Sequence, residues 1–257
     1  MKLIDSHCHL NSDFGPKTCT QLVEEAQLAG VETLITIGTD FKSLPTVQKI
    51  SENHKNVYHT VGVHPHDTAQ TDLKELDELE RAATHPKCRA IGEIGLDYHY
   101  SHSPQEIQRD LLEQQLEVAL KTRLPVVIHS RDAENDLLLF LTQYAQKASG
   151  IPGVIHCFSG TLEFGKKCLD LGFYLSFSGI LTFKKADEIR QAAKFFPLER
   201  LLIETDSPYL APVPFRGKKC EPSMIVYTAL KLAEIKEISI EQVAEITTEN
   251  TQKIFQL

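Results

Sequence analysis

Six side chains that commonly bind metal ions stand at the ends of apolar runs in this sequence. Each lies at or just after the downstream end of a run whose composition is typical of a β-strand. Strand ends of a parallel barrel meet at one face, so residues that are distant in sequence can share one pocket there. This placement predicts a metal centre with the following ligands: His7, His9, Glu93, His129, His156 and Asp206.

His7 and His9 form the first of these signals. One residue separates them, and because side chains alternate along a strand, both imidazoles point to the same side and can share one ion. A single such pair also occurs at many surface and core positions. It gains weight here from the other strand ends.

The same pattern recurs at three later positions. His129 ends Pro-Val-Val-Ile-His, His156 follows Gly-Val-Ile, and Asp206 follows Leu-Leu-Ile-Glu-Thr. Any one buried histidine can instead be satisfied by hydrogen bonds to the backbone. Repetition at equivalent positions favours metal binding over that alternative.

Glu93 is an acid inside the apolar run Ala-Ile-Gly-Glu-Ile-Gly-Leu-Asp. A buried carboxylate without a partner is costly or becomes protonated, and a metal ion removes that cost. Since a carboxylate has two oxygens, Glu93 can bridge two cations about 3.5–4 Å apart, the separation typical of hydrolytic sites with two metals.

The elements that must position these residues alternate between strand-like and helix-like segments. Between the strand-like runs, apolar residues recur at helical spacing, as in Leu22, Val23 and Ala26 or Leu112, Leu116 and Ala119. This order predicts a (β/α)8 TIM barrel over residues 1–257, in which helices after Pro222 complete the outer ring. An open doubly wound sheet has the same alternation, but its usual glycine-rich phosphate loops are missing after the early strands. The eight strand-like runs are Leu3–His7, Thr33–Gly38, Val57–Val63, Arg89–Gly95, Pro125–His129, Gly153–Cys157, Phe173–Phe177 and Arg200–Glu204.

Length and composition indicate a single barrel-sized domain. The chain has 257 residues, of which 42% are hydrophobic, and its six cysteines form no CxxC pair, which is typical of reduced thiols. The start reaches Asp5 and His7 too early for the apolar core of a signal peptide, so we expect a cytoplasmic protein without a membrane segment or an obligate protein partner. A net charge of -8 argues against a protein that coats duplex nucleic acid, but not against a nucleic acid held locally by metal ions.

The chain resembles the TatD family of metal-dependent hydrolases, a branch of the amidohydrolase-like barrels that includes deoxyribonucleases. The resemblance runs almost end to end. It implies a first metal on His7, His9, Glu93 and Asp206, and a second on Glu93, His129 and His156. One departure is Cys220, where the family leads us to expect asparagine before Glu-Pro. The motifs are Asp-Ser-His-Cys-His at 5–9, Gly-Val-His-Pro-His at 62–66, Gly-Glu-Ile-Gly-Leu-Asp-Tyr at 92–98, His-Ser-Arg-Asp-Ala at 129–133, His-Cys-Phe-Ser-Gly at 156–160, Glu-Thr-Asp-Ser-Pro-Tyr at 204–209 and Arg-Gly-Lys at 216–218.

The expected activity is a deoxyribonuclease that trims single-stranded DNA from an end, with 3'-to-5' exonuclease action. Two divalent cations, Mg, Mn or Zn, would activate a water that attacks phosphorus. The histidine content favours zinc or manganese over magnesium, which the family resemblance also permits. We expect Glu93 to bridge the metals, Asp206 to accept the proton of the water, and His64 to contact substrate or transfer a proton.

Four further residues are expected to bind the substrate. Arg131 lies two residues past His129, where its guanidinium could hold a phosphate, although it could also pair with Asp132. Arg216 and Lys218 belong to a short basic run that could hold the DNA backbone or be ordinary solvated surface. Tyr209 could stack an unpaired base, and Glu204 is expected to orient ligands.

Two other functions remain open. The same centre could hydrolyse a carboxylic ester, an amide or a lactone, including an aminoacyl ester on transfer RNA. A centre with two metals can activate water for attack on carbonyl carbon as well as on phosphorus. A purely structural metal is the other alternative. Structural zinc sites are usually closed and rich in cysteine, whereas these ligands are histidines and carboxylates at an open strand end.

Overall fold

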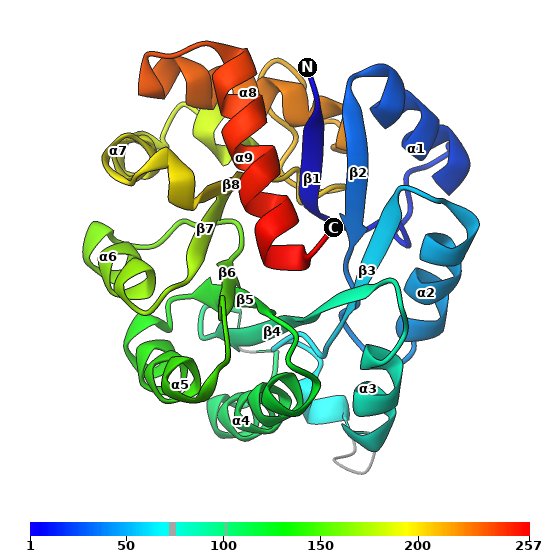
Figure 1. The fold of residues 1–257 in the computed structure, drawn as a ribbon, viewed down its shortest axis with the longest axis vertical. Coiled ribbons are helices and arrows are strands. Elements are labelled where there is room, and N and C mark those ends of the chain that lie inside the picture. Colours follow the sequence, from blue (N-terminus) through cyan, green and yellow to red (C-terminus); the bar gives the residue numbers. More distant parts are fainter. Residues whose placement is uncertain (72–75, 101) are drawn as a thin grey trace.

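Eight parallel strands follow one another around a barrel in chain order (Figure 1). The computed structural model describes residues 1–71, 76–100 and 102–257. The barrel closes just past the last strand, where Cys8 and Ser207 form an isolated parallel β-bridge. There the backbone N–H of His9 donates to the Ser207 carbonyl at 2.8 Å. The predicted barrel is therefore confirmed. Its strands are β1 (Leu3–Cys8), β2 (Val31–Thr36), β3 (Val57–Val61), β4 (Cys88–Asp97), β5 (Val126–Arg131), β6 (Gly153–Ile155), β7 (Tyr174–Phe177) and β8 (Leu201–Ile203).

A ring of helices surrounds the strands (Figure 1). Their apolar residues at helical spacing face inward: Leu22, Val23 and Ala26 of α1 are buried, as are Leu112, Leu116 and Ala119 of α4. None of the helices in the described ranges is long and apolar enough to cross a membrane. The helices of the ring are α1 (Cys19–Leu28), α2 (Leu44–Asn53), α3 (Leu76–Ala83), α4 (Gln105–Thr122), α5 (Glu134–Lys147), α6 (Leu162–Asp170), α7 (Asp187–Phe195) and α8 (Ile225–Lys236).

The last helix, α9 (Ile240–Phe255), corrects the prediction that all helices after Pro222 complete the outer ring. It lies across the amino end of the barrel (Figure 1), where Asn250 donates to the carbonyls of Leu198 and Leu201. At its end Ile254 and Phe255 pack against apolar side chains of the strands, which removes that end of the barrel interior from water. The amino end is thus covered, and the carboxyl end is left for a site.

The strands end where the backbone turns at the carboxyl face. Asp132, Cys157 and Asp206 have φ values of +53°, +44° and +56° and lie just past β5, β6 and β8. Residues other than glycine rarely adopt this left-handed region, so each is held there by its surroundings. Consequently β6 and β8 end earlier than predicted, and His156 and Asp206 lie in the segments that follow them.

His59 on β3 makes the stability of the fold sensitive to acid. Its side chain is fully buried, and its Nδ1 lies 2.8 Å from the Ser51 hydroxyl. Burial lowers the pKa of His59 from 6.5 to about 4, so the unfolded chain binds this proton first as the pH falls. The stability that His59 contributes is therefore complete above pH 6.5 and is lost as the pH falls from 6.5 toward 4.

We expect the burial of His59 to lower the unfolding free energy of the metal-free protein by about 2 kcal/mol when the pH falls from 7 to 5. Urea denaturation of the wild type and of His59→Asn at both pH values measures the difference, because every other titrating group is common to the two proteins. Equal losses in both proteins would show that His59 is not the cause.

Candidate metal centre

The six predicted ligands converge around Glu93 at the carboxyl end of the barrel. Oε1 of Glu93 lies 2.7 Å from Nε2 of His156 and 3.0 Å from Nδ1 of His129, while Oε2 lies 3.4 Å from Nε2 of His7. Asp206 is placed opposite, with Oδ1 3.3 Å from Nε2 of His9 and 3.6 Å from Nε2 of His7. Strand ends that are far apart in the sequence therefore supply one compact cluster.

Three overlapping groups in this cluster have the spacing to hold a cation. They are His7, His9 and Glu93; His7, His156 and Asp206; and His64, Glu93 and His129, with ligand atoms of each group within 4.8 Å of one another. The rings of His7 and His156 stack with their centroids 3.9 Å apart, which links the two sides of the cluster. How the ligands divide between two ions stays a prediction.

For two of the histidines, His129 and His156, a buried carboxylate fixes which ring nitrogen faces the centre. Asp97 Oδ2 lies 3.1 Å from Nε2 of His129. Glu204 Oε1 lies 3.3 Å from Nδ1 of His156. An ionised carboxylate can only accept, so those nitrogens carry the protons, and the opposite nitrogens point their lone pairs at Glu93.

This arrangement has the chemistry of a cation site. Two imidazole lone pairs and a carboxylate oxygen meet at hydrogen-bond distance, so a proton or a metal ion must lie among them. Although burial opposes the charged form, Glu93 raises the pKa of His156 well above its ordinary value. Burial alone would raise the pKa of Glu93, but the neighbouring histidines lower it well below its ordinary value. Nitrogen and carboxylate donors of this kind fit zinc, manganese or iron.

His64 differs from the other histidines of the cluster. Its Nδ1 accepts the backbone N–H of His66 at 3.1 Å, so a neutral His64 carries its proton on Nε2, which lies 3.4 Å from Oε1 of Glu93. Burial lowers the pKa of His64 to about 4. A neutral His64 therefore points its Nε2–H toward Glu93.

Tyr209 and Arg131 lie at the rim of the centre. The ring of Tyr209 is 58% exposed and its centroid is 5.9 Å from that of His9. Arg131 is exposed, with its guanidinium 5.0 Å from the centre of the Tyr100 ring.

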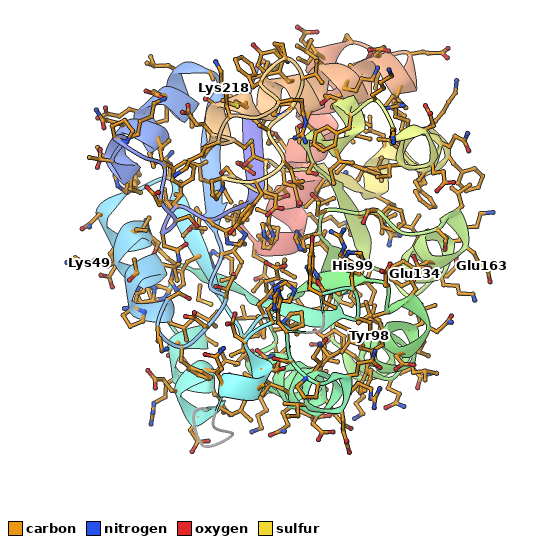
Figure 2. All side chains as sticks on the ribbon, turned by 180° about the vertical axis from the view of Figure 1, so that it is seen from behind. Lys49, Tyr98, His99, Glu134, Glu163 and Lys218 are labelled. Carbon is orange, nitrogen blue, oxygen red and sulfur yellow. The ribbon has the colours of Figure 1, made fainter. Side chains whose placement is uncertain are left out.

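An open cleft of about 890 Å³ extends from Arg131 along the loops that follow β4, β5 and β6. Tyr98, His99 and Glu134 mark this side of the carboxyl face in Figure 2. Ser130, which follows His129 directly, also lines the cleft. The six ligands are not among its lining residues, and the cleft adjoins the end of β5, the strand that carries His129.

The loop that carries Arg216 and Lys218 is held by contacts within itself and with Phe183. Arg216 stacks 3.7 Å from the centre of the Phe183 ring and donates to the Ala211 carbonyl at 3.0 Å. Lys218 lies 5.7 Å from the centre of the Phe215 ring, toward the edge of the face in Figure 2. Within the described ranges, neither cation contacts any of the six ligand residues.

Cys220 lies at the end of the same loop, where the family pattern leads us to expect asparagine. Its side chain is buried, with Sγ 4.0 Å from the Thr205 carbonyl. It therefore packs beneath the loop rather than facing a substrate.

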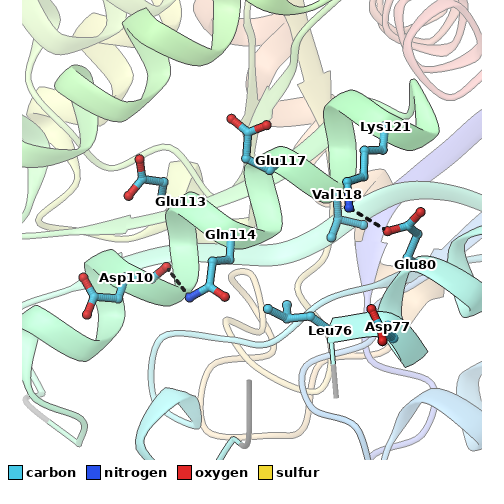
Figure 3. Close-up of a pocket in the computed structure, with 9 residues that line it drawn as sticks. All are labelled: Leu76, Asp77, Glu80, Asp110, Glu113, Gln114, Glu117, Val118 and Lys121. Atoms are coloured by element: carbon cyan, nitrogen blue, oxygen red, sulfur yellow. Dashed lines mark hydrogen bonds and ion pairs between the residues drawn. The ribbon is translucent and has the colours of Figure 1, made fainter. Parts of the chain in front are cut away.

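A separate hollow of about 580 Å³ lies between α3 and α4 on the outer ring (Figure 3). Its lining is rich in carboxylates, of which Glu80 pairs with Lys121 at 3.1 Å. It contains none of the six ligands, so it is not part of the centre.

Asp97 is a residue of the site that the sequence reasoning missed. Nε2 of His66 lies 2.9 Å from the same Asp97 oxygen that faces His129. A signal for Asp97 was present, because it lies four residues after Glu93 on β4 and side chains two and four apart share one face of a strand.

Comparison with known proteins agrees with this geometry. The family model of TatD-related DNases matches residues 4–256. The chain is 38% identical over 255 residues to the Bacillus subtilis protein named uncharacterized metal-dependent hydrolase YabD, covering 99% of both chains. It is 37% identical to the Escherichia coli protein named uncharacterized metal-dependent hydrolase YcfH, covering 100% of this chain and 97% of that protein. Among solved structures it resembles YJJV, a TatD homologue from Escherichia coli, with a TM-score of 0.91 and 29% identity over 99% of this chain and 98% of the other.

Proposed function

The chain belongs to the TatD-related DNase family and is a metal-dependent hydrolase of that type, and on this premise we propose that it degrades single-stranded DNA from the 3' end. The observation that carries the proposal is the convergence of two oriented imidazole lone pairs on Glu93, with the exposed Arg131 nearby. Such a centre suits hydrolysis of a phosphodiester at the end of a flexible strand.

We assign two divalent cations to this centre. His7, His9, Glu93 and Asp206 would hold the first, and Glu93, His129 and His156 the second. When bound, such cations lower the pKa of a water molecule and offset negative charge on the phosphoryl group. The donor set favours zinc or manganese, and magnesium remains permitted.

Asp206 is our candidate to accept the proton of the attacking water. Its side chain is only partly exposed, and burial alone would raise its pKa, but the hydrogen bond from His9 and the nearby histidines lower the pKa below its ordinary value. Asp206 is therefore ionised at neutral pH and can take up a proton.

His64, Arg131 and Tyr209 would contact the substrate. The Nε2–H of a neutral His64 can donate a hydrogen bond to a phosphoryl oxygen, and the ring stays uncharged. Arg131 has a planar guanidinium with no carboxylate partner in the described part of the chain, and it can hold a phosphate at two points. Tyr209 can stack on an unpaired base, while Arg216 and Lys218 would contact the strand farther out.

The net charge of -8 favours a single strand that enters a local site over a duplex bound through a broad basic surface. Cytoplasmic location and the lack of an obligate protein partner stay predictions. These features do not affect the chemistry of the centre.

Hydrolysis of a carboxylic ester or a lactone is the second candidate, and one observation favours it. The cleft that Arg131 lines also includes Asp132, Glu134 and Asp136, whose negative charges would repel a phosphate chain that extended along it. A neutral lactone, or the positively charged amino group at the aminoacyl end of a transfer RNA, would meet no such repulsion in this cleft.

Chelated protein reloaded with Mg, Mn or Zn distinguishes these activities. It should be assayed on single-stranded DNA labelled at either end, on a duplex of the same sequence, and on carboxylic esters, lactones and aminoacyl-tRNA. We expect the single strand to shorten stepwise from its 3' end and Arg131→Gln to weaken substrate binding. Ester hydrolysis without DNA cleavage would reject the nuclease in favour of the second candidate.

A further inference from the structure

Asp97 is a buried carboxylate with every acceptor position filled. Its Oδ1 accepts the backbone N–H groups of His99 at 3.0 Å and Tyr100 at 2.9 Å. Its Oδ2 faces Nε2 of His66 at 2.9 Å and Nε2 of His129 at 3.1 Å. Four N–H donors therefore hold the charged form and fix which oxygen faces the two imidazoles.

The backbone of Asp97 is fixed as firmly as its side chain. Its N–H donates to Oε1 of Gln108 at 2.8 Å, and Nε2 of Gln108 donates back to its carbonyl at 2.9 Å. Gln108 is itself fully buried on α4, and it also donates to the Ser103 carbonyl at 2.8 Å. The carboxylate consequently cannot turn away from His129 without breaking a buried network.

We propose that Asp97 is a positioning residue that keeps the proton of His129 on Nε2 and so presents the Nδ1 lone pair to the second metal. This inference rests on the ligand role proposed for His129. It does not depend on which substrate the centre hydrolyses. Partners of this kind orient metal-binding histidines and typically change metal affinity by about 10–100-fold when they are replaced.

His66 provides a control within the same group. It shares Oδ2 of Asp97 with His129, but 28% of its side chain is exposed, and its ring lies against the rings of His64, Tyr100 and His102. Removing the imidazole of His66 leaves the Asp97–His129 hydrogen bond in place. His66→Gln should therefore leave the affinity for the second metal nearly unchanged.

Asp97→Asn should be more damaging than a simple loss of charge. The two backbone N–H groups at Oδ1 require an acceptor, so the amide oxygen must face them and the amide NH2 must face the imidazoles. His129 then has to accept at Nε2 and carry its proton on Nδ1. In that tautomer the lone pair that the metal needs is lost.

Two measurements test the inference. The first is the 15N NMR shift of the His129 ring in chelated wild-type protein, assigned with His129→Gln. We expect the neutral His129 ring to carry its proton on Nε2, and a neutral ring with its proton on Nδ1 instead would overturn the proposal without any need for an Asp97 variant. This readout needs neither metal nor substrate.

The second measurement is a calorimetric titration of chelated protein with Zn²⁺ or Mn²⁺. Asp97→Asn should lower the affinity for the second equivalent by about 10–100-fold, with less effect on the first, while His66→Gln retains both. Wild-type affinity for both equivalents in a folded Asp97→Asn protein would overturn the proposal. If these results hold but DNA is not cleaved, the nuclease function fails and the role of Asp97 stands.

Discussion

Glu93→Gln is expected to lower the rate of hydrolysis by roughly 10³-fold or more. Glu93 is the only residue of the cluster whose two oxygens face both sides of it, toward His156 and His129 on one side and His7 on the other. A glutamine keeps the shape but replaces one oxygen with an NH2 group and removes the negative charge. Either set of histidines then loses its shared anionic partner.

Turnover and bound metal should be measured together for this variant, with Glu245→Gln as the control. Glu245 is exposed on α9, at the covered end of the barrel, so the same change there should affect neither quantity. Glu93→Gln should lose metal as well as turnover. Turnover close to wild type in a folded Glu93→Gln protein would remove Glu93 from the centre.

Asp206→Asn should have the second largest effect, a fall in turnover of about 10²–10⁴-fold. Asparagine retains an oxygen that can face His9, but it cannot accept a proton from water. Because His7, His9 and Glu93 remain, the variant should still bind metal. Loss of turnover without a matching loss of metal distinguishes a proton acceptor from a residue that serves only as a ligand.

Equilibrium dialysis and initial rates on a short single strand measure these two properties of Asp206→Asn. Asp170→Asn, an exposed change at the end of α6, is the matched control. Unchanged turnover in Asp206→Asn would reject the role of base. Complete loss of both metals would instead indicate that Asp206 acts as an essential ligand.

The barrel could be predicted because each of its strands carries its own apolar run and each helix its own periodicity. The end of the chain was harder to predict. The apolar stripe of α9 looks the same whether the helix packs on the side of the barrel or across its amino end. The side chains that Ile254 and Phe255 cover come from several strands, and only the closed barrel brings them together.

The convergence of these histidines and acids could be predicted because they follow apolar strands in a regular way. The contacts that tune it could not, because they join segments far apart in the chain. Asp97 faces His66 and His129 only after β3, β4 and β5 are assembled. The stacking of Arg216 on Phe183 depends in the same way on how two loops pack, so the basic run alone could not reveal it.

The most direct test of a nuclease centre with two metals is the rate of single-stranded DNA cleavage as metal is added stepwise to metal-free protein. We expect little cleavage with one equivalent, nearly full cleavage with two, and none in Glu93→Gln at any metal content. Folded protein that takes up two equivalents of metal and still leaves DNA intact would contradict the central claim.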